Sequence, residues 1–241
     1  MMTISSDLRY DAVLFDVGGT LIGFHDRESF RDFLQHVDLP SGESEAELFH
    51  RRFVTVVQAS REEAMGLGAD GSALEAWWQS VFTRTWPARP DLAKKMGRWF
   101  WDGGFQQVFP DVMPGLESLA GLGLTLGVVS NFTADLEQLL IRRGLHDAFR
   151  FVIASSVVGR AKPDPGIFDL AVAETGVSRR RTLYVGDHYG DDIEGARKAG
   201  LDAVLIDRGD RRWKLPCPRI SSLGELLPYV RHPGGDTRAI I

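Results

Sequence analysis

Asp16 lies between a short apolar run and a pair of glycines, where its carboxylate could act on a bound anion. Residues 12–15, AVLF, predict a strand buried on both faces, as in a parallel sheet covered by helices. Open α/β sheets bind ligands beyond the carboxyl ends of their strands, so we expect Asp16 at a reactive position. Gly18 and Gly19 let the backbone turn with its N–H groups exposed, as an anion site requires. An ordinary strand followed by an Asp–Gly turn explains this segment equally well.

Two further strand-like runs lead to residues that can bind phosphate. Residues 125–129 end at Ser130 and Asn131, a hydroxyl and an amide that can hold phosphate oxygens without adding charge. Residues 151–154 precede Lys162, which lies between a glycine and two prolines and would supply a point charge for a phosphate. A common turn and an ordinary helix start are the simpler explanations of these residues.

A fourth strand-like run ends among carboxylates. Residues 182–185 lead to Asp187, and Asp191 and Asp192 precede a helix that we expect over residues 193–199. Hard cations such as Mg²⁺ take oxygen ligands, usually one or two carboxylates together with waters and phosphate oxygens. The acidic pair also fits the usual bias toward acids at the start of a helix. These aspartates are therefore candidate ligands of a magnesium ion.

The order of these segments resembles the four signatures of the haloacid dehalogenase-like (HAD) hydrolase superfamily. The matching motifs are Asp16–Thr20, Ser130-Asn131, Lys162–Pro165, and Gly186-Asp187 with Asp191-Asp192. The resemblance covers the chain from about Tyr10 to Leu205, apart from the insert between the first two motifs. It implies an α/β fold with a doubly wound parallel sheet, a Rossmann-like core and an inserted α-helical cap of the C1 type.

The pattern of the chain agrees with an inserted cap. Strand-like and helical patterns alternate before residue 22 and after about residue 108, as in a parallel sheet. The insert between them is helical, with helices expected over residues 28–37, 45–65 and 91–101, and another that begins at Asp70 or Ser72 and ends at Thr85. Ser41 is a weak start signal for the second of these helices.

These patterns define the expected domains. The core comprises residues 1–22 and 108–230, the cap residues 23–107, and a flexible tail residues 231–241. The resemblance implies that the cap closes over the site, with hinges near residues 22–24 and 107–111. Five of the six tryptophans lie in the insert. We expect them to pack the core of the cap, and the alternative is that one or two form the roof of a substrate pocket.

The resemblance also implies a mechanism. Asp16 would attack a phosphoryl group and form an aspartyl-phosphate, a form of covalent catalysis. The implied ligands of Mg²⁺ are Asp16, the backbone carbonyl of Gly18, Asp187 and Asp192, with Asp191 as the competitor of Asp192. The implied phosphate-binding groups are Gly19, Ser130, Asn131 and Lys162, of which Lys162 also serves catalysis by offsetting negative charge.

Gly18 departs from the family pattern. Phosphatases of this family carry a second aspartate at that position, which protonates the leaving group and then activates water. General acid–base catalysis contributes roughly 10²–10⁴-fold. The expected enzyme is therefore a phosphatase of small phosphorylated metabolites with weak or specialised activity. His25 or His188 could replace the missing acid, or the substrate could be an acyl or aryl phosphate that needs no proton.

Three other functions stay open. A dehalogenase of this family usually has a tyrosine at that position and needs no metal, and the intact Asp187 and Asp192 argue against it. A phosphonatase needs a cap lysine, and the insert has only Lys94 and Lys95, near its end. A non-catalytic Mg²⁺- and phosphate-binding module of regulatory function would explain the missing acid but not the retained nucleophile.

Composition sets outer limits on the partners. The chain has 241 residues, 44% of them apolar, and a formal net charge of −5, with no basic cluster large enough for a nucleic acid. No stretch of about 20 apolar residues could span a bilayer, and no signal peptide is recognisable. The single cysteine, Cys217, excludes an internal disulfide and fits a reducing compartment. We expect a cytoplasmic protein without membrane or nucleic-acid partners, of undetermined oligomeric state.

Overall fold

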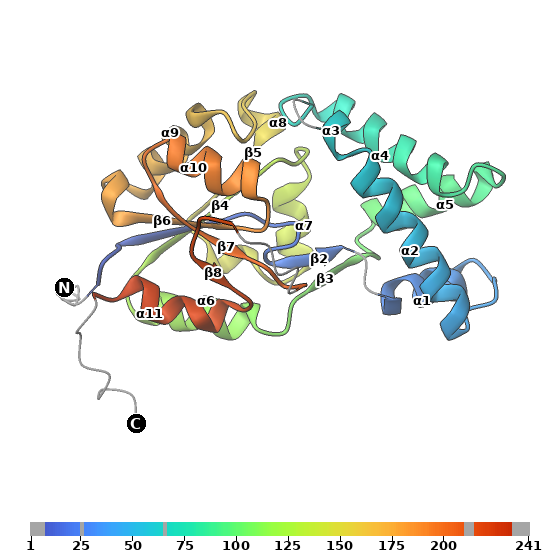
Figure 1. Cartoon of the computed structure of the whole chain (residues 1–241), viewed down its shortest axis with the longest axis horizontal. Coiled ribbons are helices and arrows are strands. Elements are labelled where there is room, and N and C mark those ends of the chain that lie inside the picture. Colours follow the sequence, from blue (N-terminus) through green and yellow to red (C-terminus); the bar gives the residue numbers. More distant parts are fainter. Residues whose placement is uncertain (1–7, 25–26, 65–66, 210–214, 233–241) are drawn as a thin grey trace.

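A six-stranded parallel sheet forms the core of the computed structural model, which describes residues 8–24, 27–64, 67–209 and 215–232. The strand order is β5-β4-β1-β6-β7-β8 (Figure 1). The strands are β1 (Ala12–Phe15), β4 (Thr125–Ser130), β5 (Phe151–Ala154), β6 (Thr182–Gly186), β7 (Asp202–Ile206) and β8 (Arg219–Ile220). The four strands predicted from apolar runs are confirmed, and β4 and β6 are one residue longer than expected.

Helices cover both faces of the sheet, as a doubly wound fold requires (Figure 1). On one face lie α6 (Val112–Gly121), α7 (Leu136–Arg142) and α11 (Leu227–Val230); on the other lie α9 (Pro165–Thr175) and α10 (Gly195–Lys198). Alternation along β1 sends Phe15 into the first layer and Leu14 into the second. The shorter elements are α8 (Ser155–Val158), η1 (His146–Ala148), η2 (Arg179–Arg181) and η4 (Leu223–Leu226).

The helix expected over residues 193–199 begins differently. A π-helical turn, η3 (Tyr189–Glu194), precedes α10. The ring of His188 accepts the N–H of Asp191 at 3.1 Å, so the chain enters the helix through a side-chain cap. Turns of this wide type are frequent at functional sites. The acidic pair therefore lies inside the first turn rather than before it.

The insert folds into a helical cap beside the sheet (Figure 1). Its helices are α1 (Arg27–His36), α2 (Glu43–Ala59), α3 (Arg61–Ala64), α4 (Gly71–Thr85) and α5 (Pro90–Trp101). Phenylalanines fill its separate core, among them Phe30, Phe53, Phe82 and Phe100. An antiparallel pair, β2 (Ile22–Phe24) and β3 (Gln106–Val108), joins the cap to the sheet at the two expected hinge segments.

Two details of the predicted cap were wrong. The helix expected over residues 45–65 is interrupted at Ser60, whose hydroxyl donates to the Val56 carbonyl while its own carbonyl accepts from the Trp77 indole. Gly42 rather than Ser41 precedes α2, without a side-chain cap. At α4 the prediction is resolved in favour of Asp70, whose carboxylate accepts the N–H groups of residues 72 and 73.

The termini of the described chain lie side by side, since Leu8 forms a β-bridge with Arg231. Residues 233–241 of the expected tail lie outside the described residues. A search of the described helices finds none that combines the length and the apolar character needed to cross a bilayer.

Candidate active site

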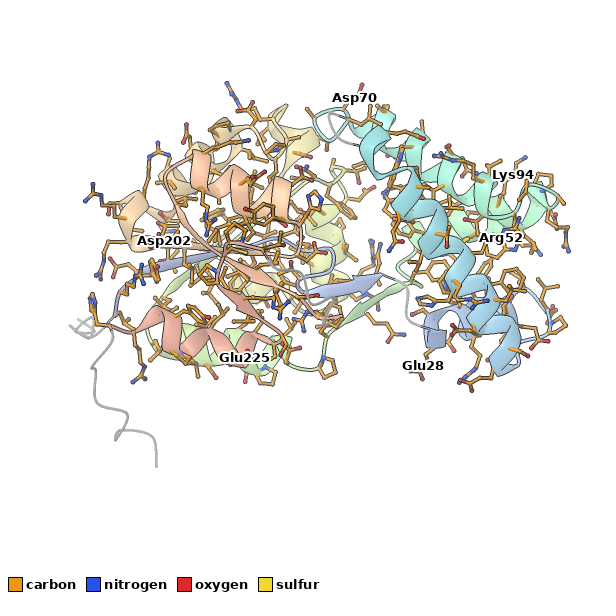
Figure 2. The ribbon with its side chains drawn as sticks, viewed as in Figure 1. Glu28, Arg52, Asp70, Lys94, Asp202 and Glu225 are labelled. Carbon is orange, nitrogen blue, oxygen red and sulfur yellow. The ribbon has the colours of Figure 1, made fainter. Side chains whose placement is uncertain are left out.

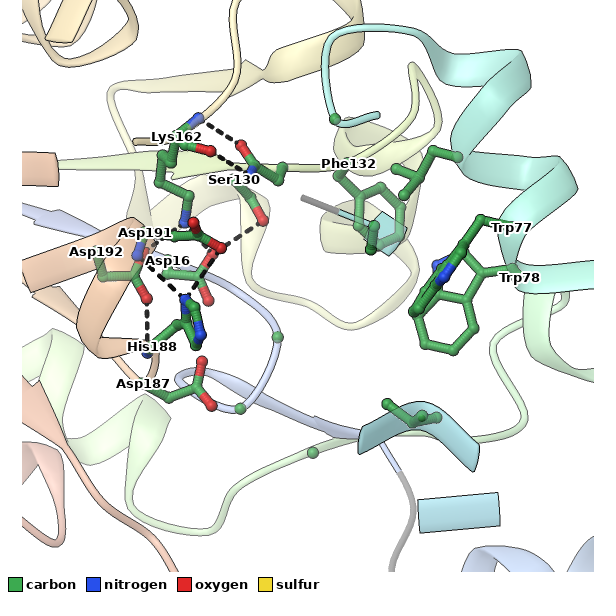
Figure 3. Close-up of a pocket in the computed structure, with 18 of the residues that line it drawn as sticks. Asp16, Trp77, Trp78, Ser130, Phe132, Lys162, Asp187, His188, Asp191 and Asp192 are labelled. Atoms are coloured by element: carbon green, nitrogen blue, oxygen red, sulfur yellow. Dashed lines mark hydrogen bonds and ion pairs between the residues drawn. The ribbon is translucent and has the colours of Figure 1, made fainter. Parts of the chain in front are cut away.

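Three neighbouring strands bring the predicted residues to one edge of the sheet. Asp16 follows β1, Ser130 ends β4, and Asp187 follows β6; β4 and β6 flank β1 on either side. From β1 the sheet extends to β4 and β5 on one side and to β6, β7 and β8 on the other. Ligands of open α/β sheets bind where the strand order reverses in this way. Figure 3 shows these side chains gathered around one cavity.

Lys162 is the centre of the hydrogen-bond network. Its Nζ donates to Asp16 Oδ1 and Asp192 Oδ1, both at 2.6 Å, and to the Tyr184 hydroxyl at 3.1 Å. These three bonds use all the protons of an ammonium group. The Lys162 side chain is 3% exposed, and that of Asp192 1%, so the ion pairs are shielded from water.

Charge keeps Lys162 protonated in spite of its burial. Burial by itself lowers the pKa of a lysine, but Asp16 and Asp192, together with Tyr184, raise the pKa of Lys162 well above its ordinary value. Burial raises the pKa of Asp192, and the nearby ammonium of Lys162 opposes that shift. The site therefore contains a permanent positive charge against the candidate nucleophile.

Asn131 positions this lysine. Its Oδ1 accepts the backbone N–H of Lys162 at 2.8 Å, and its Nδ2 donates to the Lys162 carbonyl at 2.9 Å. These two bonds fix the backbone of the loop at Lys162, so that the Lys162 side chain reaches the edge of the sheet. The described contact is thus with Lys162, and a phosphate contact by Asn131 stays a prediction.

The two oxygens of Asp16 differ in their surroundings. Oδ1 accepts from Lys162 and, at 3.0 Å, from the Ser130 hydroxyl. Oδ2 lies 3.4 Å from the hydroxyl of Thr20. Asp16 is 6% exposed and lines the cavity. Among the residues that the structure describes, Oδ1 is therefore held by strong donors and Oδ2 has a long contact with Thr20, which leaves Oδ2 better placed to bind or attack a ligand.

Gly19 has a structural role in the turn, and its phosphate contact stays a prediction. Its N–H donates to the Ile22 carbonyl at 2.8 Å, so this N–H is engaged within the turn rather than directed at an anion. Its φ is +77°, and a Cβ there would lie 2.5 Å from Asp187 Oδ2. Glycine is required at this position because it lets the carboxylate of Asp187 approach the turn.

The carboxylates of Asp16, Asp187 and Asp192 form a cluster with candidate ligand atoms within 4.8 Å of one another. Three carboxylates and the single ammonium of Lys162 carry a formal net charge of −2. This donor set fits Mg²⁺, which takes carboxylate oxygens. Both oxygens of Asp192 are already engaged, one by Lys162 and the other by the N–H of His188 at 2.9 Å. Asp192 is thus better suited to an indirect role than to a direct metal bond.

The other candidates near the edge have clear positions. Gly18 lines the cavity, as do His188 and Asp191. The ring Nδ1 of His188 lies 3.0 Å from the carboxylate of Asp191. A proton-transfer role for His188 stays a prediction. His25, the other proposed substitute for an acid, lies outside the described residues.

The cavity encloses about 380 Å³ between the sheet edge and the cap. The Asp16 edge is polar, and the opposite side is formed by cap residues that include Trp77 and Trp78 (Figure 3). Both predictions for the tryptophans hold in part: Trp86 and Trp99 pack within the cap, whereas Trp77 and Trp78 both pack there and line the cavity.

Sequence reasoning missed Tyr184. It is fully buried in the middle of β6, and its hydroxyl lies 3.0 Å from the Val129 carbonyl and 3.1 Å from Asp192 Oδ1. The only available signal was a hydroxyl-bearing residue within an otherwise apolar strand. A tyrosine is common in strands, so this signal would not have distinguished it.

Comparison with known proteins identifies the family. The family model of haloacid dehalogenase-like hydrolases matches residues 10–200. A protein named haloacid dehalogenase-like hydrolase domain-containing protein 3, from Danio rerio, is 35% identical over 176 residues, which are 68% of this chain and 73% of that protein.

Solved structures agree with this assignment. A HAD phosphatase from Thermococcus onnurineus superposes with a TM-score of 0.60 at 28% identity, over 91% of this chain and 97% of its own. A 2-haloacid dehalogenase from Pseudomonas syringae gives a TM-score of 0.58 at 28% identity, over 92% and 97%. The chain belongs to the haloacid dehalogenase-like hydrolase family.

Proposed function

We propose that this hydrolase is a Mg²⁺-dependent phosphatase that uses Asp16 as its nucleophile. The observation that carries the proposal is the arrangement of Lys162, whose Nζ lies 2.6 Å from both Asp16 and Asp192 at the edge where Asp187 also lies. Removing an ammonium and two carboxylates from water costs desolvation free energy. A group buried at such a cost in a cavity is therefore a candidate for a functional role. It would neutralise charge on a transferring phosphoryl group.

The residues divide the work of the reaction. Asp16 Oδ2 attacks phosphorus while Lys162 and Ser130 hold Oδ1. The bond from phosphorus to the leaving oxygen breaks, and its electron pair stays on that oxygen. Water then attacks the aspartyl-phosphate, which restores the carboxylate of Asp16 and releases inorganic phosphate. The protons of that water pass to the phosphate and to solvent.

The candidate metal residues are Asp16, Asp187 and the carbonyl of Gly18, with Asp192 orienting the ion's waters. When bound, Mg²⁺ would screen the excess negative charge of the site so that a phosphate dianion can approach. Lys162 alone leaves that excess in place.

Gly18 limits the proposed activity. A glycine carbonyl can still serve the metal, but it cannot give a proton to a leaving group. We propose weak or specialised turnover, which favours substrates whose leaving group needs little protonation. The cap, assigned to residues 23–107, is proposed to close over the substrate, and a small phosphorylated molecule is the proposed partner of a cytoplasmic enzyme.

The alternatives fit the site less well. A dehalogenase of this family needs no metal, and the cluster of three carboxylates, which suits a metal ion, argues against that function. A phosphonatase needs a cap lysine in the cavity, but Lys94 is exposed on the outer side of the cap (Figure 2), and neither it nor Lys95 lines the cavity. A regulatory binding module could use Lys162 to hold a phosphate, but it would gain little from the retained nucleophile Asp16.

The test is steady-state hydrolysis of p-nitrophenyl phosphate with and without Mg²⁺, by the purified protein and by Asp16→Asn. We expect turnover that requires Mg²⁺ and disappears in Asp16→Asn. Turnover that survives in Asp16→Asn would exclude Asp16 as nucleophile. No turnover by the unmodified protein, with Mg²⁺ still bound, would favour the regulatory module. A control variant, Asp135→Asn at the exposed start of α7, should retain full activity.

A further inference from the structure

The side of the cavity that faces Asp16 is apolar. It is built from Val57 of α2, Ala64 of α3, Leu74, Trp77 and Trp78 of α4, and Phe132, which follows β4. We call these six residues the apolar wall. Figure 3 shows Trp77, Trp78 and Phe132 across the cavity from the carboxylates. A group that is attached to a phosphoryl group at Asp16 and stays within the cavity would lie against this wall.

The apolar wall offers little hydrogen bonding. The indole N–H of Trp77 donates to the Ser60 carbonyl at 3.1 Å, so this ring presents carbon atoms to the cavity. Among the cap side chains that the structure describes as lining the cavity, none is charged. A substrate with several hydroxyls, an amine or a second carboxylate would lose its water there without gaining a partner, and such losses reduce binding steeply.

Aromatic groups suit the apolar wall in shape as well. Trp77 and Trp78 are packed edge to face with ring centres 4.8 Å apart. Trp78 in turn stacks on Phe82 and packs at a tilt against Phe100. A ring inserted against them would gain area burial and edge-to-face contacts without requiring the cap to rearrange. The flat faces and edges of these rings favour a flat, uncharged group over a flexible one, since a flexible group loses more conformational freedom when it binds.

The chemistry of the turn after β1 points the same way. Gly18 supplies no proton at the position after Asp16, and this favours a leaving oxygen that can accept the electron pair of the broken bond without one. A phenol has a pKa of about 10, whereas water and simple alcohols are near 15.7, so a phenolate leaves far more readily. An aryl leaving group is therefore compatible with two independent features of the molecule: its ring fits the apolar wall, and its oxygen leaves without a proton from residue 18.

We propose that the substrate is a phosphate monoester of an uncharged aromatic alcohol, whose ring lies against the apolar wall. This rests on the proposed phosphatase function. Asp16 attacks phosphorus, the bond from phosphorus to the aryl oxygen breaks, and the electron pair leaves with the phenolate, which takes a proton from solvent. Water then cleaves the aspartyl-phosphate to inorganic phosphate and free Asp16.

The first experiment compares kcat/KM for four substrates in the presence of Mg²⁺. Phenyl phosphate has both an aryl leaving group and an uncharged ring; benzyl phosphate keeps the ring but leaves as an alkoxide. Phosphotyrosine keeps the aryl leaving group but adds charge, and glycerol 1-phosphate has neither feature. We expect phenyl phosphate to exceed benzyl phosphate and phosphotyrosine by about tenfold or more each, with glycerol 1-phosphate the poorest. Equal or better use of phosphotyrosine or glycerol 1-phosphate would overturn the proposal.

A binding experiment keeps this inference separate from the proposed function. Phenylphosphonate and methylphosphonate cannot be hydrolysed in this way, and calorimetry with Mg²⁺ measures their affinity for Asp16→Asn. We expect phenylphosphonate to bind about tenfold more tightly or better, whether or not the protein turns over any ester. Equal affinities would overturn the apolar wall even if the enzyme proves to be a phosphatase.

Matched variants locate the effect. Trp78→Leu and Trp99→Leu remove the same ring from the cap, but only Trp78 lines the cavity. Val57→Thr and Val54→Thr add the same hydroxyl to α2, and only Val57 lines the cavity, so this pair serves if the tryptophan variants fail to fold. We expect Trp78→Leu and Val57→Thr to raise KM for phenyl phosphate about tenfold and to leave acetyl phosphate unaffected. Equal effects of both members in each pair would contradict the assignment.

Discussion

Tyr184 connects the interior of the sheet to the site, because its hydroxyl contacts Lys162 and Asp192. Its hydroxyl contacts Lys162 Nζ, Asp192 Oδ1 and the Val129 carbonyl, all at 3.0–3.1 Å and all buried. Burial raises the pKa of Tyr184 well above its ordinary value, so the phenol stays protonated and can donate. The lysine thus depends on a tyrosine that makes no contact of its own with the cavity.

Tyr184→Phe tests this dependence. Removal of the hydroxyl leaves a proton of Lys162 and one carbonyl without that partner, which should lower the free energy of unfolding by about 1–3 kcal/mol. Urea denaturation measures the loss. Tyr229→Phe, on α11 and far from the site, should stay within about 0.5 kcal/mol of the unmodified protein. Equal free energies of unfolding for the two variants would show that the Tyr184 hydroxyl does not stabilise the fold.

Gly18→Asp tests the account of the missing acid. A carboxyl group at this position should donate a proton to an alkoxide and raise turnover of alkyl phosphates, by up to about 10²-fold at the low end of general acid catalysis. Aryl phosphates should gain much less because their leaving group needs no proton. Gly18→Asn has a similar side chain without an acidic proton and should give no gain. An unchanged rate for Gly18→Asp in a correctly folded protein would refute the account.

At the scale of elements, Arg208 ties together the two segments that lead into and out of the cap. Its Nε donates to the Thr20 carbonyl at 2.8 Å, and its Nη1 to Asp111 Oδ1 at 2.7 Å. Its guanidinium lies 3.9 Å from the ring centre of Phe109. The other oxygen of Asp111 accepts the N–H of Leu223 at 2.7 Å. The base of the cap is therefore anchored to the end of the sheet.

The Asp111 carboxylate makes this anchor dependent on pH. Burial opposes its ionisation, but the hydrogen bonds from Arg208 and Leu223 outweigh it and lower the pKa of Asp111. Because the folded pKa is the lower one, the stabilisation is complete above the unfolded value of about 3.9 and is lost as pH falls through the folded value.

Asp111→Asn should therefore lower the free energy of unfolding by about 1–2 kcal/mol at neutral pH, after allowance for partial exposure. The difference from the unmodified protein should stay constant from pH 7 to pH 5 and shrink below pH 4, as measured by urea denaturation. Asp135→Asn, at the exposed start of α7, serves as the control variant in the same series of denaturation experiments. A difference that persists undiminished at pH 3 would exclude Asp111 as the source.

The loop before α4 is another contact between cap and core. A Cβ on Gly68 would lie 2.9 Å from the Ala161 Cβ and 3.2 Å from Asn131 Cγ. The Ser155 hydroxyl donates to the Gly68 carbonyl. The cap thus meets the core beside the two segments that fix Lys162.

Gly68→Val should push this loop away from the core and misplace the substrate, which lowers kcat/KM by about tenfold or more. The free energy of unfolding should fall by no more than about 1–3 kcal/mol, because the buried Ser155 hydroxyl loses the Gly68 carbonyl while the core of each part is untouched. Gly121→Ala introduces a Cβ that meets nothing within 4 Å and serves as control. Wild-type kcat/KM in Gly68→Val would show that this contact does not set the geometry of the site.

At the scale of the whole molecule, the sequence predicted the sheet edge better than the cap. The apolar runs before Asp16, Ser130 and Asp187 predicted strands, and parallel pairing then brings their ends together. The interruption at Ser60 depends on the indole of Trp77, seventeen residues away, and no local pattern encodes that contact. The role of Gly19 was missed because it depends on Asp187, which only the fold brings near.

The cap and the core together determine the strength of electrostatic interactions in the cavity. The core presents clustered carboxylates and one buried ammonium, and the cap closes the other side of a cavity of about 380 Å³ with apolar groups. Electrostatic interactions in such a partly enclosed space are stronger than in water. A phosphoryl group bound there would therefore be attracted by the Lys162 ammonium more strongly than on an open surface.

Trapping a phosphorylated intermediate tests most directly whether Asp16 is the nucleophile. The protein is mixed with phenyl phosphate and Mg²⁺, quenched in acid, digested and analysed by mass spectrometry. We predict one added phosphoryl group on the peptide that carries Asp16, absent when Mg²⁺ is omitted and absent in Asp16→Asn. Turnover without any phosphorylated peptide, or with the label on another residue, would contradict the central claim.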